Sequence, residues 1–218
     1  MVRTVRIPVI GLLLLLVVGQ QVFSQEKRDF YLWNTAYFHV RLNPKYNFRL
    51  SSKIQYLTQD DLRETTYVDL SVSRKMNDWL NLGLAFRTAQ HQKLTSDKME
   101  YRPQLVTTMH WSPAKIKYST TNRAEYLMFN EGDNYGRFYH NIFVHFSSSG
   151  KWPKPYLGEE LFTKLNGEKL HLARLYGGLH LLEWQRFHLD IFYVWQQLKV
   201  GGQWSGDDVA GLNLHFFI

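Results

Sequence analysis

The sequence predicts an all-β protein, a closed antiparallel transmembrane β-barrel of about 10–12 strands preceded by a cleavable signal peptide. Three observations support this prediction. The first residues have the order of an export signal, the rest of the chain alternates apolar and polar residues, and aromatic residues recur beside one set of turns.

The N-terminal segment is basic, then apolar, then polar. Two arginines lie within Met1–Arg6, an apolar run covers residues 7–18, and Val22-Phe23-Ser24 places small or modest residues before Gln25. This is the order of a secretory signal peptide, and the apolar run is shorter than the roughly 20 residues that a spanning helix needs. We therefore expect residues 1–24 to be a signal peptide cleaved near Ser24-Gln25, and residues 25–218 to form the barrel.

The rest of the chain has the period of two that β-strands show. In residues 48–56, one face carries Phe48, Leu50, Ile54 and Tyr56, and the other carries Arg49, Ser51, Lys53 and Gln55. Segments of this kind lie near 30–41, 46–58, 65–74, 79–90, 99–111, 115–129, 137–147, 155–164, 169–182, 187–199 and 209–218. No second stretch is apolar enough to cross a membrane as a helix, so any spanning must come from strands.

The lengths of these segments favour spanning strands. Each has 10–15 residues, whereas strands of globular proteins usually have about five or six and a tilted strand crosses a bilayer in about 9–11. A soluble lipocalin-like barrel or sandwich also alternates, with shorter strands. Because membrane barrels usually have an even strand number, we expect ten or twelve strands rather than eleven. Either one strand is missed or split, or the stretch from Gln25 runs up through the lumen.

Connections alternate short and long, as in outer-membrane barrels with short periplasmic turns and longer outer loops. The short ones lie at 43–45, 76–78, 112–114, 147–153 and 183–186, and the longer ones near 59–64, 91–98, 130–136, 165–168 and 200–208. The short side carries aromatic residues: Tyr46, Trp79, Trp111, Trp152 and Trp184. Flat amphipathic rings settle at the headgroup level of a bilayer, so these five are the predicted membrane-interface aromatics.

Several short motifs follow one another along the mature chain. They are Leu32-Trp33-Asn34, Leu42-Asn43-Pro44-Lys45-Tyr46, Asn77-Asp78-Trp79-Leu80-Asn81-Leu82-Gly83, Tyr101-Arg102-Pro103-Gln104-Leu105, Asn122-Arg123-Ala124-Glu125-Tyr126, and Lys154-Pro155-Tyr156-Leu157 leading to Glu160. In this order they resemble a bacterial outer-membrane β-barrel family of unknown function, the domain of unknown function 2490 type. The resemblance implies a barrel in the outer membrane of a Gram-negative bacterium, and it implies no activity.

If the apolar face contacts lipid, the opposite face lines the lumen. The predicted lumen network consists of Arg49, Lys53, Asp69, Arg87, Arg102, Gln104, Arg123, Glu125, Glu160, Arg174 and Asp190. Small barrels are usually filled by side chains, so these groups can form a structural core of arginine–carboxylate pairs. The alternatives are a narrow, porin-like channel or ligand pocket for a small anionic solute, and an outer-membrane lipid- or lipopolysaccharide-modifying enzyme.

No catalytic or metal-binding motif is found. The chain has no cysteine, which excludes disulfides, thiolate metal sites and a lipidated N-terminal cysteine. No serine lies in a Gly-x-Ser-x-Gly elbow, and no phosphate loop or metal cluster is present. His140 and His145 are five apart on one strand and face opposite sides, and the histidines at 39, 110, 171 and 188 are scattered singly. We therefore predict no catalytic residue, no metal and no cofactor.

The charge pattern limits the partners. The formal net charge is +7 without any run of five like charges, and an exported chain is not expected to bind nucleic acid. The expected partners are outer-membrane lipids, a small anionic solute, and the barrel-assembly machinery during insertion. The last of these reads a C-terminal strand such as Gly211–Ile218, whose apolar alternation continues to the final residue.

Overall fold

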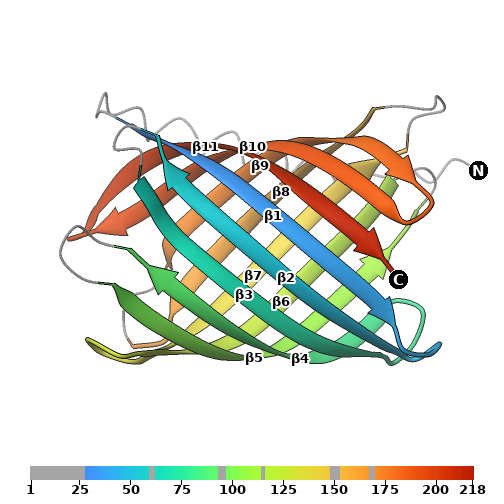
Figure 1. The fold of residues 1–218 in the computed structure, drawn as a ribbon, viewed down its shortest axis with the longest axis horizontal. Coiled ribbons are helices and arrows are strands. Elements are labelled where there is room, and N and C mark those ends of the chain that lie inside the picture. The colour runs from blue at the N-terminus through green and yellow to red at the C-terminus, as the bar shows by residue number, and fades with distance from the viewer. Residues whose placement is uncertain (1–27, 59–61, 93–96, 114–115, 148–152, 167–169) are drawn as a thin grey trace, which may run out of the picture.

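The described part of the chain consists of β-strands and their connections. The computed structural model describes residues 28–58, 62–92, 97–113, 116–147, 153–166 and 170–218, so the predicted signal peptide and its cleavage site lie outside it. The strands (Figure 1) are β1 (Asp29–Arg41), β2 (Tyr46–Leu57), β3 (Leu62–Lys75), β4 (Leu80–His91), β5 (Lys98–Trp111), β6 (Ile116–Phe129), β7 (Tyr135–Phe146), β8 (Lys154–Lys164), β9 (Leu170–Trp184), β10 (Phe187–Val200) and β11 (Gln203–Phe217). Within these ranges, no helix has the length and apolar character needed to cross a membrane.

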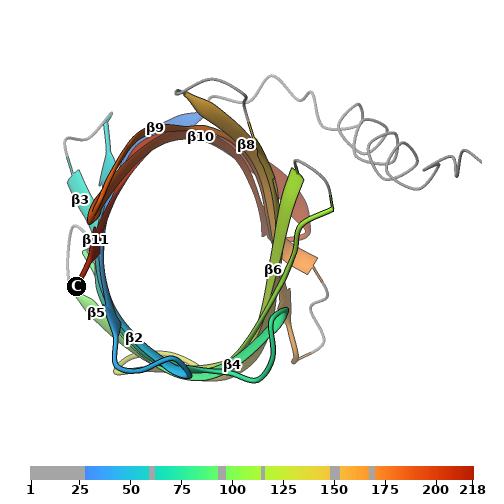
Figure 2. The same ribbon diagram turned by 90° about the vertical axis from the view of Figure 1, so that its right-hand side faces the viewer.

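These eleven strands close into one barrel, which Figure 2 shows as a ring. Each strand pairs antiparallel with its neighbour in sequence, and β1 pairs with β11 in parallel, with Asp29 opposite Asp207 and His39 opposite Phe217. When an odd number of strands is joined by hairpins, the first and last run in the same direction, so the closing pair must be parallel. The strand number thus falls within the predicted 10–12, whereas the expectations of an even number and of a wholly antiparallel barrel are wrong for the described residues.

The hairpin between β10 and β11 is tighter than the sequence suggests. Val200 pairs with Gln203, and the turn residues Gly201 and Gly202 have φ angles of 58° and 89°. Glycine adopts this left-handed region without the clash that a Cβ causes, so two glycines form a two-residue hairpin turn. The expected loop over 200–208 is wrong, because residues 203–208 begin β11 despite their polar composition. They pair with β10, and from Asp207 onward also with β1.

The connections at the two ends of the barrel are similar in length. The end where β11 finishes, here called the C-terminal end, has connections 42–45, 76–79, 112–115, 147–153 and 185–186. The opposite end has 58–61, 92–97, 130–134, 165–169 and 201–202. The predicted contrast between short and long connections is therefore wrong, because several strands extend farther into the expected loops than their alternation indicated.

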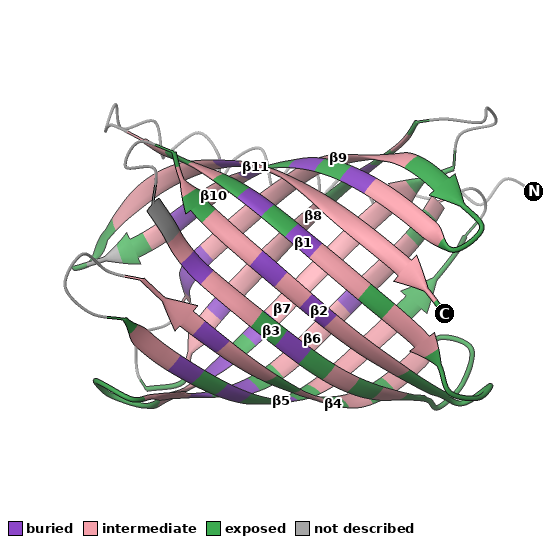
Figure 3. Cartoon of the chain, in the orientation of Figure 1, coloured by how far each residue is buried: buried purple, intermediate pink, exposed green. Residues whose placement is uncertain are grey.

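The barrel is apolar outside and polar inside. Val68 and Leu70 on β3 are 43% and 44% exposed, whereas Asp69 between them is 2% exposed. Figure 3 shows the same alternation along neighbouring strands. Water-soluble proteins bury their apolar residues and expose their charged ones, so this chain has the reverse arrangement.

Aromatic rings pack flat on one part of the lumen wall. A cluster there contains Trp33, Tyr156, Phe192, Val194 and Val209. The Phe192 ring lies over Gly211 of β11, and the Tyr156 ring lies over Gly178 of β9, in each case where a Cβ would overlap the ring. Because glycine leaves this space free, the rings lie against the wall instead of projecting across the lumen.

Candidate functional site in the barrel lumen

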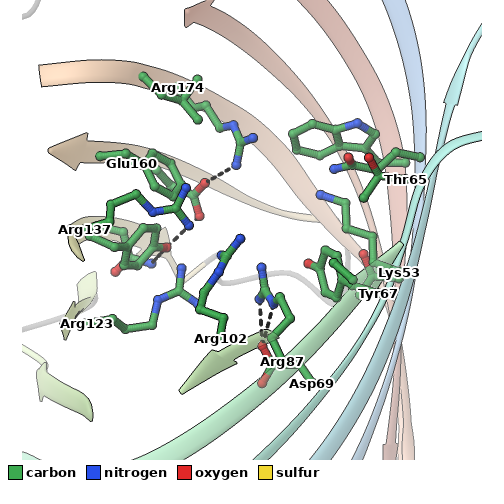
Figure 4. A pocket seen from close by; sticks show the side chains of 18 of the residues that line it. Lys53, Thr65, Tyr67, Asp69, Arg87, Arg102, Arg123, Arg137, Glu160 and Arg174 are labelled. Atoms are coloured by element: carbon green, nitrogen blue, oxygen red, sulfur yellow. Dashed lines mark hydrogen bonds and ion pairs between the residues drawn. The ribbon is translucent and has the colours of Figure 1, made fainter. Parts of the chain in front are cut away.

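The barrel encloses a cavity of about 850 Å³ with a strongly basic wall. Ten Lys and Arg residues line it against five Asp and Glu residues. Figure 4 shows basic side chains from β2, β4, β5, β6, β7 and β9 reaching into this space from around the wall. The cavity is therefore a polar chamber with an excess of positive charge.

The structure places most of the predicted lumen residues together. The cavity is lined by Arg49, Lys53, Asp69, Arg87, Arg102, Gln104, Arg123, Glu160 and Arg174. The other two lie apart from its lining: Glu125 is buried behind arginines, with no side-chain exposure, and Asp190 lies toward the C-terminal end, 7% exposed. The side chains converge because inward-facing positions recur every second residue on each strand.

Asp69 and Arg87 form the first ion pair of the chamber. Arg87 donates from Nε and Nη2 to Asp69 Oδ2, at 2.9 and 2.7 Å, from the directly opposite position on the neighbouring strand. The guanidinium carbon of Arg87 lies 3.9 Å from the centre of the Tyr67 ring. Two hydrogen bonds and the contact with an aromatic ring hold this guanidinium in one orientation.

A single carboxylate is shared by three arginines. Glu125 accepts from Arg137 at 2.6 Å and lies 3.1 Å from Arg123 and 3.6 Å from Arg102. Arg102 also pairs with Glu100. Glu100 and Arg137 are absent from the predicted lumen network, although both have the inward parity of Arg102 and Tyr139 on their own strands. This group contains three guanidiniums and two carboxylates, so one positive charge is left over.

Glu160 is the hydrogen-bond acceptor at the centre of a third cluster of lumen side chains. It receives hydrogen bonds from the Tyr139 and Tyr176 hydroxyls at 2.7 and 2.8 Å, and from Arg174 Nη1 at 3.2 Å. Arg174 also donates from Nε to Gln196 Oε1. The carboxylate is thus held by three donors, which is the environment a buried charge requires.

Lys53 has no carboxylate partner among the described residues. Its side chain is 7% exposed, and its Nζ lies 3.2 Å from the centre of the Trp33 ring and 5.9 Å from that of Tyr67. Arg49, four positions earlier on β2, faces the Tyr37 ring at 5.9 Å and likewise forms no ion pair within the described ranges. Strand β2 therefore contributes two cations that the chamber's carboxylates do not neutralise.

A chain of histidines runs along the lumen wall from β7 to β1 near the C-terminal end. His145 Nδ1 and His180 Nε2 are 3.0 Å apart, and His180 Nδ1 is 2.7 Å from Asp190 Oδ1. On the other side of the carboxylate, His215 Nε2 is 3.3 Å from Asp190 Oδ2, and His215 Nδ1 is 3.2 Å from His39 Nε2. The expectation that His39 stands singly is wrong. All five residues face inward close to the C-terminal end, which strand parity and distance from the turns could have indicated.

A hydroxyl, an imidazole and a carboxylate align near the opposite end. Thr65 Oγ1 lies 3.1 Å from His91 Nδ1, and His91 Nε2 lies 3.1 Å from Glu100 Oε2. Thr65 and His91 are directly opposite each other on β3 and β4. No serine motif indicates this set, because its hydroxyl comes from threonine and its members lie on three strands.

No group of three or more His, Asp or Glu residues in the described ranges is arranged to hold a metal ion. His140 and His145 take different partners, as their spacing indicated: His140 contacts Asn122 and His145 contacts His180. Among the predicted interface aromatics, Tyr46, Trp79, Trp111 and Trp184 are 37%, 52%, 41% and 70% exposed at the C-terminal end. Trp152 lies outside the described residues.

These features define a closed β-barrel with an apolar exterior and a basic, arginine-rich chamber. Residues 30–206 match the family described as a protein of unknown function, DUF2490, and the chain belongs to this family. Comparison with curated proteins and with solved structures finds no match. The family assigns no activity, so any function has to be argued from the site.

Proposed function

We propose that this chain is an integral outer-membrane barrel whose lumen binds or passes small anions. Its placement in a membrane is supported by the apolar outer face, on which Leu105 is 63% and Leu84 62% exposed. It is also supported by strands of 11–15 residues, since a tilted strand spans a bilayer in about 9–11. The exposed rings of Trp79, Trp111 and Trp184 at one end suit the headgroup level.

The observation that carries the proposed function is the excess of positive charge around the cavity. Ten basic residues line it against five acidic ones, and Lys53 lacks a carboxylate partner in the described part of the chain. A charge held away from water without a counter-charge is costly. A small anion in the chamber would supply the missing counter-charge, and a lumen lined by arginines repels cations.

The cavity volume limits the size of the solute. About 850 Å³ of space, crossed by side chains from several strands, suits inorganic ions and small metabolites. A filled, purely structural lumen is the competing interpretation, and ion conduction separates the two.

Planar-bilayer recordings on refolded protein test this function. We expect small steps of current and, across a gradient of potassium chloride, a reversal potential that favours chloride over potassium. Electrical silence or cation preference would remove the conducting anion lumen. Alkaline carbonate extraction of cell envelopes tests the membrane placement, which requires the protein to stay in the pellet.

One observation favours a second candidate, the hydrolysis of a membrane lipid or lipopolysaccharide ester. The Thr65–His91–Glu100 alignment has the order of nucleophile, general base and orienting carboxylate. Mass spectrometry of outer-membrane lipids from cells with and without the protein tests it. We expect loss of one acyl chain that depends on both Thr65 and His91; unchanged lipids, or an equal change with Thr65→Val, would remove this candidate.

A further inference from the structure

We infer that the chamber contains a binding site for a tetrahedral oxyanion, phosphate or the phosphoryl group of a small solute, at Lys53 Nζ between Arg87 and Arg174. This inference rests on the proposed function, because it names the class of anion that the lumen takes. It places the site on β2, β4 and β9, at the side of the chamber where Trp33 and Tyr67 lie.

Lys53 is a buried basic side chain that has no acidic partner among the described residues. Its side chain is 7% exposed and its ammonium lies 3.2 Å from the centre of the Trp33 ring. A cation–π contact compensates part of the loss of water but supplies no negative charge. Figure 4 shows the amine pointing into the cavity rather than toward the wall. No ion pair joins it to a carboxylate in the described residues, so its amine faces the open space of the cavity.

The two arginines that flank Lys53 keep donors available. Arg87 uses Nε and Nη2 on Asp69, and Arg174 uses Nε on Gln196 and Nη1 on Glu160. This leaves Nη1 of Arg87 and Nη2 of Arg174 without a hydrogen-bond partner among the described residues. Each guanidinium is therefore fixed by its carboxylate while one of its amino groups remains able to donate.

Two aromatic rings hold the three cations around one space. Arg174 lies over the Trp33 ring at 4.7 Å, on which Lys53 also packs, and Arg87 lies over the Tyr67 ring at 3.9 Å, which Lys53 faces at 5.9 Å. Three like charges gathered around one space repel one another. Their assembly here is favourable once an anion is shared among them.

The geometry favours a tetrahedral oxyanion. The donors come from three different strands, and thus approach from different directions, whereas a planar carboxylate is best bound by one fork lying in its plane. Ammonium and guanidinium groups together are the ordinary ligands of phosphate. A tetrahedral oxyanion has several acceptor oxygens, which can accept from Lys53, Arg87 and Arg174 at once, whereas chloride is a single atom.

Calorimetric titration of the refolded protein in detergent tests the site. Inorganic phosphate and a hexose phosphate are the two probes, which separate a free ion from a phosphorylated solute, and glycerol is the neutral control. We expect phosphate binding to one site, weakened about tenfold or more in Lys53→Met and retained in Lys53→Arg. Lys45→Met, which removes the same charge from an exposed turn, should bind as the wild type does.

Lys53→Met removes a buried charge and keeps the aliphatic stem, so folding is checked by heat-modifiable migration on a gel. Equal phosphate affinity in folded Lys53→Met, or no binding of either probe by the wild type, would overturn the site. Anion-selective conductance measured in the same preparation decides the proposed function separately. If selectivity persists without phosphate binding, the site is wrong and the anion lumen stands.

Discussion

The Phe192 ring on β10 lies over Gly211 on β11, in the space where any other residue would place its Cβ. Trp33 of β1 is directly opposite Gly211 on the other side. The contact between Phe192 and Gly211 thus lies beside the parallel strand pair that closes the barrel. Through it, the aromatic cluster on the lumen wall packs against the closing strand β11.

Gly211→Ala is expected to destabilise the barrel. The new methyl group overlaps the Phe192 ring and lies 2.5 Å from the backbone oxygen of Trp33. Overpacking of this kind costs about 1–3 kcal/mol. Urea unfolding followed by the folded and unfolded bands on a gel measures the change. Gly177→Ala is the matched control, because its Cβ would meet Leu157 at an ordinary 3.9 Å. If both variants are equally stable, the ring does not occupy the glycine space.

Glu125→Gln is expected to be among the most destabilising single changes in the lumen. It leaves Arg102, Arg123 and Arg137 with one carboxylate, Glu100, among them. Removing one member of a buried ionic group costs about 3–5 kcal/mol. The urea midpoint should fall strongly, whereas Glu131→Gln in an exposed turn should leave it unchanged. A wild-type midpoint for Glu125→Gln would contradict the shared-carboxylate arrangement.

Asp190→Asn is expected to break the histidine chain at its centre. The carboxylate contacts both His180 and His215, and an amide can accept from one of them while its NH₂ group faces the other. We expect a loss of about 1–3 kcal/mol in the free energy of unfolding. Asp78→Asn, at an exposed turn of the same end, is the control. The nitrogen chemical shifts of the four imidazoles should also change in Asp190→Asn and remain constant in the control.

The exposed tryptophans of the C-terminal end provide a test of the membrane placement. In vesicles, we expect lipids brominated near the headgroup to quench the fluorescence of Trp79, Trp111 and Trp184 more than lipids brominated near the chain ends. Replacing Trp184, which is 70% exposed, with Phe should reduce this quenching. Trp33→Phe should not, because Trp33 is 3% exposed and faces the lumen. Stronger quenching by lipids brominated near the chain ends would place these rings in the hydrocarbon core and contradict the predicted headgroup level.

The sequence predicted the eleven strand segments and the inward face of most of them, including nine residues that line the cavity. Features that depend on the pairing of strands were not predicted correctly. The parallel closure follows from the odd number of strands and from the pairing of β1 with β11, which no local pattern records. The polar composition of residues 203–208 predicts a loop, whereas their pairing with β10 makes them the first part of β11, the strand predicted only from residue 209.

Local alternation by itself determined that this chain forms long strands with an apolar and a polar face, because side chains of a strand point alternately to its two sides. Only the tertiary structure decided which polar side chains meet. Closure of the barrel brings His39 to within 3.2 Å of His215, 176 positions away, and places three arginines around Glu125. It also leaves Lys53 facing the cavity without a carboxylate in the described residues. The physical reason is that charge pairing depends on distance in space, which strand order, register and closure set together.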